Sequence, residues 1–198
     1  MAGIPVDLMP FGVDVEEPDG EVTPAPHQEA MSVFGFQDVW NDATVVDLGG
    51  TGPVRIPTVA GYTLLKLRAW LDRAAHPNYK DGPDLACAMY WCVDPKEIGT
   101  FSATFRDRLY DTNTGLAHLE STDFDEATAA VRQLAADAAA LLNPGRRAEL
   151  RSDWTAGPED AVLAGNLGNT QLLGWPLHGD ARLSRYAAAV RQGLNHPS

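Results

Sequence analysis

The first half of the chain carries two kinds of hydrophobic pattern that indicate strands. Residues 5–9 alternate between apolar and polar positions, which is typical of a short strand. Two β-branched runs, Thr44 to Leu48 and Val54 to Ile56, flank a glycine-rich stretch at residues 49–52 and predict a hairpin. Residues 10–28 are rich in proline, glycine and acids, so we expect a long excursion or a loose hairpin there.

Two helices are predicted to follow the hairpin. The first begins near Thr58, a suitable N-cap, and its apolar residues then recur at spacings of three and four. Lys66, Trp70 and Arg73 lie on another side of this helix. The sequence Asp-Gly-Pro-Asp at residues 81–84 predicts the start of the second helix, because it offers an N-cap acid, a proline in the first turn and a second acid at N3.

The second half of the chain has a helical pattern. Asp125 to Leu142 forms an amphipathic stripe that is ended by Asn143-Pro144-Gly145. A last helix is predicted from Asp180 to about Leu194, with leucines, alanines and one tyrosine on one face. Residues 96–124 are mixed in character and give no prediction.

These patterns together predict an α+β fold in two parts. Residues 1–95 are expected to form a mixed sheet with helices, and residues 96–198 a helical domain. No internal repeat is present. The hydrophobic content of 44% and the charged content of 21% are ordinary for a globular protein.

The net charge narrows the function classes. The chain carries a formal charge of −12, which argues against non-specific binding of nucleic acid, although a local basic groove is compatible with it. No apolar run approaches the roughly 20 residues that span a bilayer, and no secretory signal is visible. We therefore expect a cytoplasmic protein with no membrane partner.

Cysteine and histidine positions do not predict a metal or a disulfide. Cys87 and Cys92 are five residues apart in a predicted helix, a spacing that differs from the zinc or redox pattern and places them on different faces. We expect them to be small core residues. The five histidines are scattered without ligand spacing, so a zinc site is not predicted.

Three stretches carry a family resemblance. Residues 2–12 read Ala-Gly-Ile-Pro-Val-Asp-Leu-Met-Pro-Phe-Gly, and residues 31–38 read Met-Ser-Val-Phe-Gly-Phe-Gln-Asp. Residues 54–85 contain Lys-x-x-Ala-Trp-x-Asp-Arg followed by Lys-Asp-x-x-Asp-Leu, and the second block is the most specific part. Over roughly residues 2–93 the chain resembles AbiEii/AbiGii-toxin-type nucleotidyltransferases, and the helical remainder fits that family only loosely.

The resemblance implies transfer of a nucleoside monophosphate from a nucleoside triphosphate to an acceptor such as tRNA or a protein. In such chemistry Mg²⁺ neutralises the charge that develops on the phosphate oxygens. The resemblance also implies a relation to the toxins of bacterial toxin–antitoxin systems, with a cognate antitoxin as a further partner. The implied fold is a nucleotidyltransferase-like domain.

Five residues are candidates for the implied site. Asp7, at the end of the first predicted strand, matches the family's third carboxylate and would be a catalytic residue and metal ligand. Asp81 would be a second catalytic residue, and Lys66, Arg73 and Lys80 would bind the nucleotide. The alternatives remain open: an exposed strand acid for Asp7, a solvated helix face for the cations, and helix capping for Asp81.

The family's principal motif, a Gly-Ser turn followed by Asp-x-Asp, is not found before the Asp7 strand. Asp14 and Glu16 have the spacing of such a pair, but they follow the strand and lack the turn, so we interpret them as loop acids. The chain is thus expected to be an N-terminally incomplete family member. Two alternatives follow: an enzyme whose first segment lies upstream of Met1, or an inactive remnant that acts as a binding or interaction module.

Three arginines in the second half form a basic cluster, namely Arg146, Arg147 and Arg151. The sequence favours a solvated helix surface for them, and contact with RNA phosphates is the alternative. Trp70, between the two cations of the first long helix, is predicted to pack in the core rather than to stack on a base.

Overall fold

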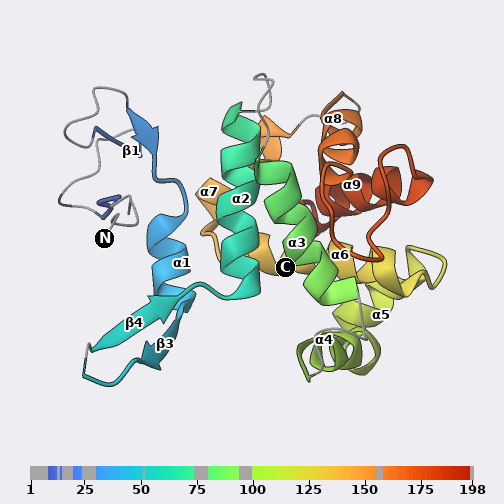
Figure 1. Ribbon diagram of the computed structural model, residues 1–198, viewed down its shortest axis with the longest axis horizontal. Coiled ribbons are helices and arrows are strands. Elements are labelled where there is room, and N and C mark those ends of the chain that lie inside the picture. Colours follow the sequence, from blue (N-terminus) through green and yellow to red (C-terminus); the bar gives the residue numbers. More distant parts are fainter. Residues whose placement is uncertain are drawn as a thin grey trace.

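The fold is described by a computed structural model, in which helices surround one core and two small sheets lie to one side (Figure 1). The predicted α+β class is therefore confirmed. The described residues are 9–12, 14, 20–23, 30–50, 52–73, 80–93, 100–154 and 158–196.

Both sheets in the described ranges are antiparallel pairs. Strand β1 (Glu21–Val22) pairs with β2 (Met31–Ser32), and β3 (Thr44–Asp47) pairs with β4 (Pro53–Ile56). The predicted hairpin is thus confirmed, with helix α1 (Phe36–Asp42) before it. The described strands form two separate pairs instead of one mixed sheet. The strand expected at residues 5–9 lies outside the described residues except for its last member.

Helices α2 (Val59–Arg73) and α3 (Asp81–Val93) confirm the two helices predicted after the hairpin. Thr58 caps α2 as expected: its hydroxyl accepts a hydrogen bond from the Gly61 amide at 3.1 Å. Trp70 is fully buried, and its ring lies 5.2 Å from that of Trp154, which confirms the packing role.

The second half contains six helices within the described residues. They are α4 (Thr100–Asp111), α5 (Asn113–Glu120), α6 (Glu126–Ala140), α7 (Pro144–Asp153), α8 (Pro158–Leu167) and α9 (Ala181–Leu194). The sequence predicted α6 and α9 but not the other four. Those four are short or lack a continuous apolar stripe, so local pattern alone does not define them.

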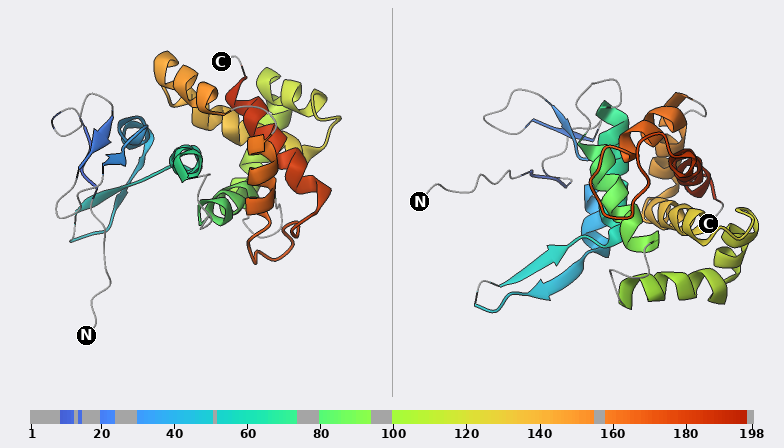
Figure 2. Two further views of the ribbon diagram at one scale, coloured as in Figure 1. Left: turned by 90° about the horizontal axis from the view of Figure 1, so that it is seen from above. Right: turned by 45° about the vertical axis from the view of Figure 1, so that its right-hand side comes forward.

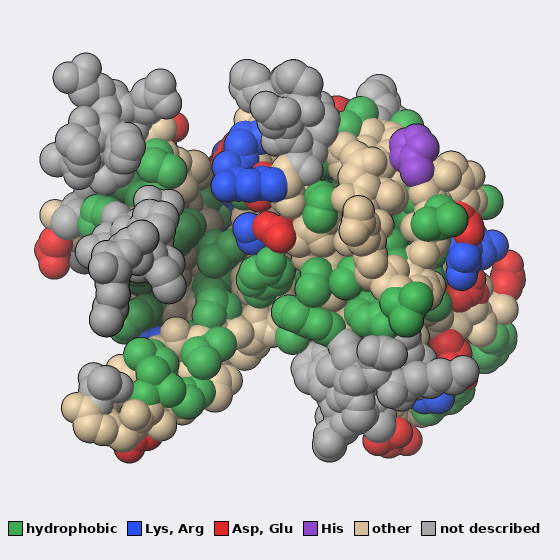
Figure 3. All heavy atoms as spheres, viewed as in Figure 1, with side chains coloured by type: hydrophobic (Ala, Val, Ile, Leu, Met, Phe, Trp, Pro, Cys, Tyr) green, Lys and Arg blue, Asp and Glu red, His purple; other side chains and the backbone are tan. Residues whose placement is uncertain are grey.

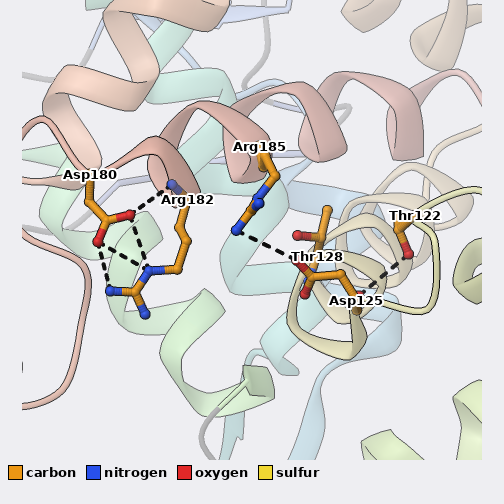
Figure 4. Close-up of polar contacts among 6 residues, drawn as sticks. All are labelled: Thr122, Asp125, Thr128, Asp180, Arg182 and Arg185. Atoms are coloured by element: carbon orange, nitrogen blue, oxygen red, sulfur yellow. Dashed lines mark hydrogen bonds and ion pairs between the residues drawn. The ribbon is translucent and has the colours of Figure 1, made fainter.

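Side-chain caps define where α6 and α9 begin (Figure 4). The Asp125 carboxylate accepts a hydrogen bond from the Thr128 amide at 3.1 Å, and Asp180 accepts one from the Arg182 amide at 2.8 Å. Arg185 of α9 reaches back to Asp125 at 3.8 Å, so the two helix starts are also linked by charge.

Helix α6 lies at the centre of the helical core and packs against α2, α3 and α9 (Figures 1 and 2). The buried apolar residues form one cluster that extends from Phe34 to Leu194. Residues from both predicted parts of the chain therefore contribute to a shared core. The boundary predicted near residue 95 is not marked by a separate core.

The β3–β4 hairpin projects away from the helices (Figures 1 and 2). Arg55 of β4 packs over the Trp40 ring of α1 at 4.9 Å and donates to the Trp40 carbonyl oxygen at 3.2 Å, which attaches the hairpin to α1. Several large apolar side chains in this region are exposed, namely Trp40, Val45, Leu48, Val54 and Ile56.

Both cysteines are free, with Cys92 in the core and Cys87 partly buried. Among the helices of the described ranges, none is long and apolar enough to cross a membrane.

The contact between α6 and α9 depends on a glycine. A Cβ atom at Gly193 would collide with the Arg132 carbonyl oxygen and would lie 2.8 Å from the Ala135 Cβ. We predict that Gly193→Ala lowers the free energy of unfolding by about 2 kcal/mol, because the two helices must separate. Urea denaturation measures this loss. The neighbouring exposed change Gln192→Ala should stay within about 0.5 kcal/mol of wild type, and an equal loss in both variants would contradict the prediction.

His118 of α5 is fully buried, and neither ring nitrogen has a hydrogen-bond partner in the described part of the chain. Its ring lies 4.6 Å from that of His196. Burial, together with the nearby charges of His196 and Arg132, lowers the pKa of His118 to about 4. His118 is therefore neutral in the folded state at pH values where it would be charged in the unfolded chain.

This depressed pKa predicts acid destabilisation. The unfolded chain binds the extra proton below about pH 6.5, so the contribution of His118 is present above that pH and is lost as the pH falls towards 4. Between pH 7.5 and pH 4.5 the free energy of unfolding should fall in both proteins. We expect this fall to be smaller in the His118→Leu variant than in wild type, by on the order of 2 kcal/mol. Chemical denaturation at both pH values tests this. The control variant His178→Gln, at an exposed position, should show the same change in the free energy of unfolding between the two pH values as wild type.

Candidate functional site

Three of the predicted site residues meet between α2 and α3. The Arg73 Nη2 atom lies 2.8 Å from Asp81 Oδ2, and the Lys66 Nζ atom lies 3.7 Å from Asp81 Oδ1. Lys66 is also 2.5 Å from Asp84 Oδ2. The spacing of these residues along the chain did not indicate that their side chains pair with one another across two helices.

Asp81 is the buried centre of this group. Its side chain is only 4% exposed, and Oδ1 accepts no hydrogen bond from the described residues. Helix α3 begins at Asp81. The carbonyl oxygen of the preceding residue, Lys80, accepts a hydrogen bond from the Asp84 amide at 3.4 Å. The Asp81 side chain thus pairs with α2, a role that the capping interpretation missed.

The two cations are partly accessible. The side chains of Lys66 and Arg73 are 27% and 47% exposed. Burial lowers the pKa of Lys66, but the hydrogen bond and charge of Asp84 outweigh it and leave this pKa above its ordinary value. Lys66 therefore stays charged. Two cations and two carboxylates balance, so the group has no net charge.

The other predicted residues do not join this group in the described structure. Lys80 is exposed beside the start of α3. Asp7 and Glu16 lie outside the described residues, and Asp14 is exposed.

Two aromatic side chains, which the sequence analysis did not select, continue the same surface. The Lys66 Nζ atom lies 5.7 Å from the centre of the Tyr62 ring, and this ring lies 6.2 Å from that of Trp91. We use the name α2–α3 stripe for Tyr62, Lys66 and Arg73 of α2 with Asp81, Asp84 and Trp91 of α3. Figure 3 shows charged side chains of both signs over the upper part of these helices, beside an apolar area.

The stripe does not provide a Mg²⁺ site by itself. Asp81 and Asp84 each face a cation at close range, and a metal ion would have to displace it. Within the described residues no group of three or more histidine, cysteine, aspartate or glutamate side chains could hold a metal. The predicted metal role therefore rests on Asp7.

A polar cavity of about 450 Å³ lies on the other side of α2, between that helix, β1–β2 and α7. Its central cation, Arg68, is paired with Asp153 at 2.5 Å and with Asp72 at 3.0 Å. Burial raises the pKa of Asp72 despite the opposing charge of Arg68. The lining of this cavity carries three carboxylates, Glu21, Asp72 and Glu149, against the two guanidiniums of Arg68 and Arg146, so it is a weaker candidate for an anion site than the stripe.

The three arginines of the basic cluster each contact another segment of the fold. Arg146 pairs with Asp38 at 2.9 Å, and Arg147 donates to the Leu142 carbonyl oxygen at 3.1 Å. Arg151 donates to the Leu194 carbonyl oxygen at 2.6 Å. The three side chains are partly exposed, as a solvated surface predicts, but each guanidinium also contacts another part of the fold.

Comparison with known proteins gives no family assignment: no protein-family model, no curated protein and no solved structure matches the chain.

The pairing around Asp81 generates a stability prediction. Replacing Lys66 and Arg73 together by alanine leaves a buried carboxylate without a countercharge, which should cost about 3 kcal/mol. Adding Asp81→Asn to that double variant should recover part of the loss, because the buried charge is then removed. Denaturant midpoints measure both effects.

A matched control uses two exposed ion pairs, Arg106–Glu126 and Arg182–Asp180. Replacing Arg106 and Arg182 together by alanine should cost less than about 1 kcal/mol. If Asp81→Asn gave no recovery in the Lys66 and Arg73 background, the buried carboxylate would not be the cause of the loss.

Proposed function

We propose that this chain is a nucleotidyltransferase-family protein related to toxin components of bacterial toxin–antitoxin systems. In this proposal the cationic end of the α2–α3 stripe binds the phosphates of a nucleoside triphosphate. The nucleoside monophosphate is then transferred to an acceptor such as tRNA or a protein, and pyrophosphate leaves.

One observation carries the proposal. Lys66 belongs to the block Lys-x-x-Ala-Trp-x-Asp-Arg, and Asp81 belongs to the block Lys-Asp-x-x-Asp-Leu. The two blocks lie on different helices, yet the Lys66 ammonium and the Asp81 carboxylate are 3.7 Å apart, with Arg73 on the other oxygen of Asp81. This convergence of motif residues supports a common role at one site.

In this proposal each residue of the stripe has its own task. Asp81, buried between the two cations, fixes their positions and so acts as a positioning residue. Lys66 and Arg73 offer N–H donors to phosphate oxygens, which charge-assisted hydrogen bonds favour. Asp84 is 37% exposed and can turn towards water when a phosphate takes its place at Lys66. Lys80 would contribute at the exposed edge.

Mg²⁺ belongs to the proposal through Asp7, the implied catalytic residue and metal ligand. When bound, the ion would supply charge neutralisation on the phosphate oxygens. The residues of the stripe act without it: they hold and orient the triphosphate.

An inactive binding or interaction module is the second candidate. The exposed apolar side chains of the β3–β4 hairpin favour it, since an exposed apolar surface often marks a contact with another protein. A cognate antitoxin is the partner that this candidate implies.

Calorimetric titration with ATP or GTP tests the phosphate site. Because Asp84 competes with phosphate for Lys66, we expect weak binding by wild type and binding several-fold tighter in Asp84→Asn. Lys66→Ala and Arg73→Ala should each weaken binding by about tenfold, or 1.4 kcal/mol. Arg106→Ala, which removes an exposed cation elsewhere, should match wild type. Unchanged binding in all three stripe variants would contradict the phosphate role.

A transfer assay separates the two candidate functions. The chain is incubated with labelled nucleoside triphosphates, Mg²⁺ and total tRNA. Labelled tRNA that disappears in Asp7→Ala and in Lys66→Ala would support the enzyme. Triphosphate binding without any transferred label would favour the binding module.

A further inference from the structure

We infer that Tyr62 and Trp91 form the subsite for the base of the nucleotide, with Lys66 and Arg73 holding the phosphates; this inference rests on the proposed function. The ligand class is thus a nucleoside triphosphate bound lengthwise along the stripe. The base lies at the aromatic end and the phosphates lie at the cationic end.

The spacing on α2 supports a lengthwise site. At about 100° per residue, Tyr62, Lys66 and Arg73 point within about 40° of one another, so they form one row along the helix. Tyr62 and Arg73 are separated by about 16 Å along the helix axis, a span that accommodates a triphosphate, a ribose and a base in sequence. Their partners on α3 occur in the opposite chain order: Asp81 faces Arg73, Asp84 faces Lys66 and Trp91 faces Tyr62.

Contacts connect the row from end to end. Arg73 pairs with Asp81, Asp81 lies near Lys66, and Lys66 pairs with Asp84 and lies over Tyr62. A ligand that contacts both ends must therefore combine an anionic part with a flat part that stacks.

The aromatic pair suits a base. The Tyr62 and Trp91 rings are inclined at 44° with their centres 6.2 Å apart, and both side chains are only partly buried. Stacking of a base on an exposed aromatic ring contributes about 1–3 kcal/mol. Burial and the neighbouring Asp84 charge raise the pKa of Tyr62, so its hydroxyl stays protonated and can donate to the base or ribose.

The test compares ATP with inorganic tripolyphosphate, which lacks the base and ribose. Binding of both ligands is measured by calorimetry for wild type, Tyr62→Leu and Tyr62→Phe. We expect wild type to bind ATP at least tenfold more tightly than tripolyphosphate. Tyr62→Leu should lose most of that difference while its affinity for tripolyphosphate stays within twofold. Tyr62→Phe should retain most of the difference, because the ring remains and only the hydroxyl donor is lost.

Two further variants complete the test. Trp91→Leu should act like Tyr62→Leu, provided that its thermal midpoint shows a folded protein. Tyr110→Leu removes an exposed tyrosine of α4, away from the stripe, and should leave both affinities unchanged.

The outcomes are distinct. Equal wild-type affinity for ATP and tripolyphosphate would overturn the base subsite and leave the phosphate site intact. If Tyr62→Leu weakened the binding of ATP and of tripolyphosphate equally, the base subsite would also be overturned, because Tyr62 would then act only by supporting Lys66. If wild type bound neither ligand, the proposed function itself would fail, and the base subsite with it.

Discussion

A buried carboxylate at the start of α3 is the interaction on which the arrangement of the site depends. A carboxylate that is 4% exposed is costly unless it is paired, and Asp81 meets this need with Lys66 and Arg73 of α2. The next residue, Gly82, allows α8 to approach, since a Cβ atom there would lie 2.6 Å from the Asn166 Cβ. Two consecutive residues thus link α3 to α2 on one side and to α8 on the other.

The same pairing determines the electrostatics of the candidate site. In a chain of net charge −12, two cations on one surface offer a local attraction for a phosphate. Asp81 and Asp84 cancel that attraction in the ligand-free protein. Asp81 is buried and paired with both cations, whereas Asp84 is partly exposed. Only Asp84 is therefore easily displaced. Under the proposed function, Asp84 therefore sets the affinity and Asp81 sets the geometry.

The sequence predicted those elements of the fold that depend on interactions between residues close together in the chain. The hairpin, the Thr58 cap and the capped helices α6 and α9 followed from turn residues, caps and periodicity. Helices α4 and α5 did not, because their contact requires Gly115 against the backbone of α4, which only the folded chain reveals. Lys66, Arg73 and Asp81 were selected one by one. Their pairing, the burial of Asp81 and the aromatic end of the stripe depend on how α2 packs on α3, which sequence spacing does not encode.

A crystal structure with a bound non-hydrolysable nucleoside triphosphate analogue would show whether the stripe holds the phosphates. We predict phosphate oxygens about 2.8 Å from the Lys66 ammonium and the Arg73 guanidinium, with Asp81 still between the two cations and Asp84 turned away. A nucleotide bound in the polar cavity beside Arg68, or a stripe whose four charges keep their partners while the nucleotide lies elsewhere, would contradict this prediction.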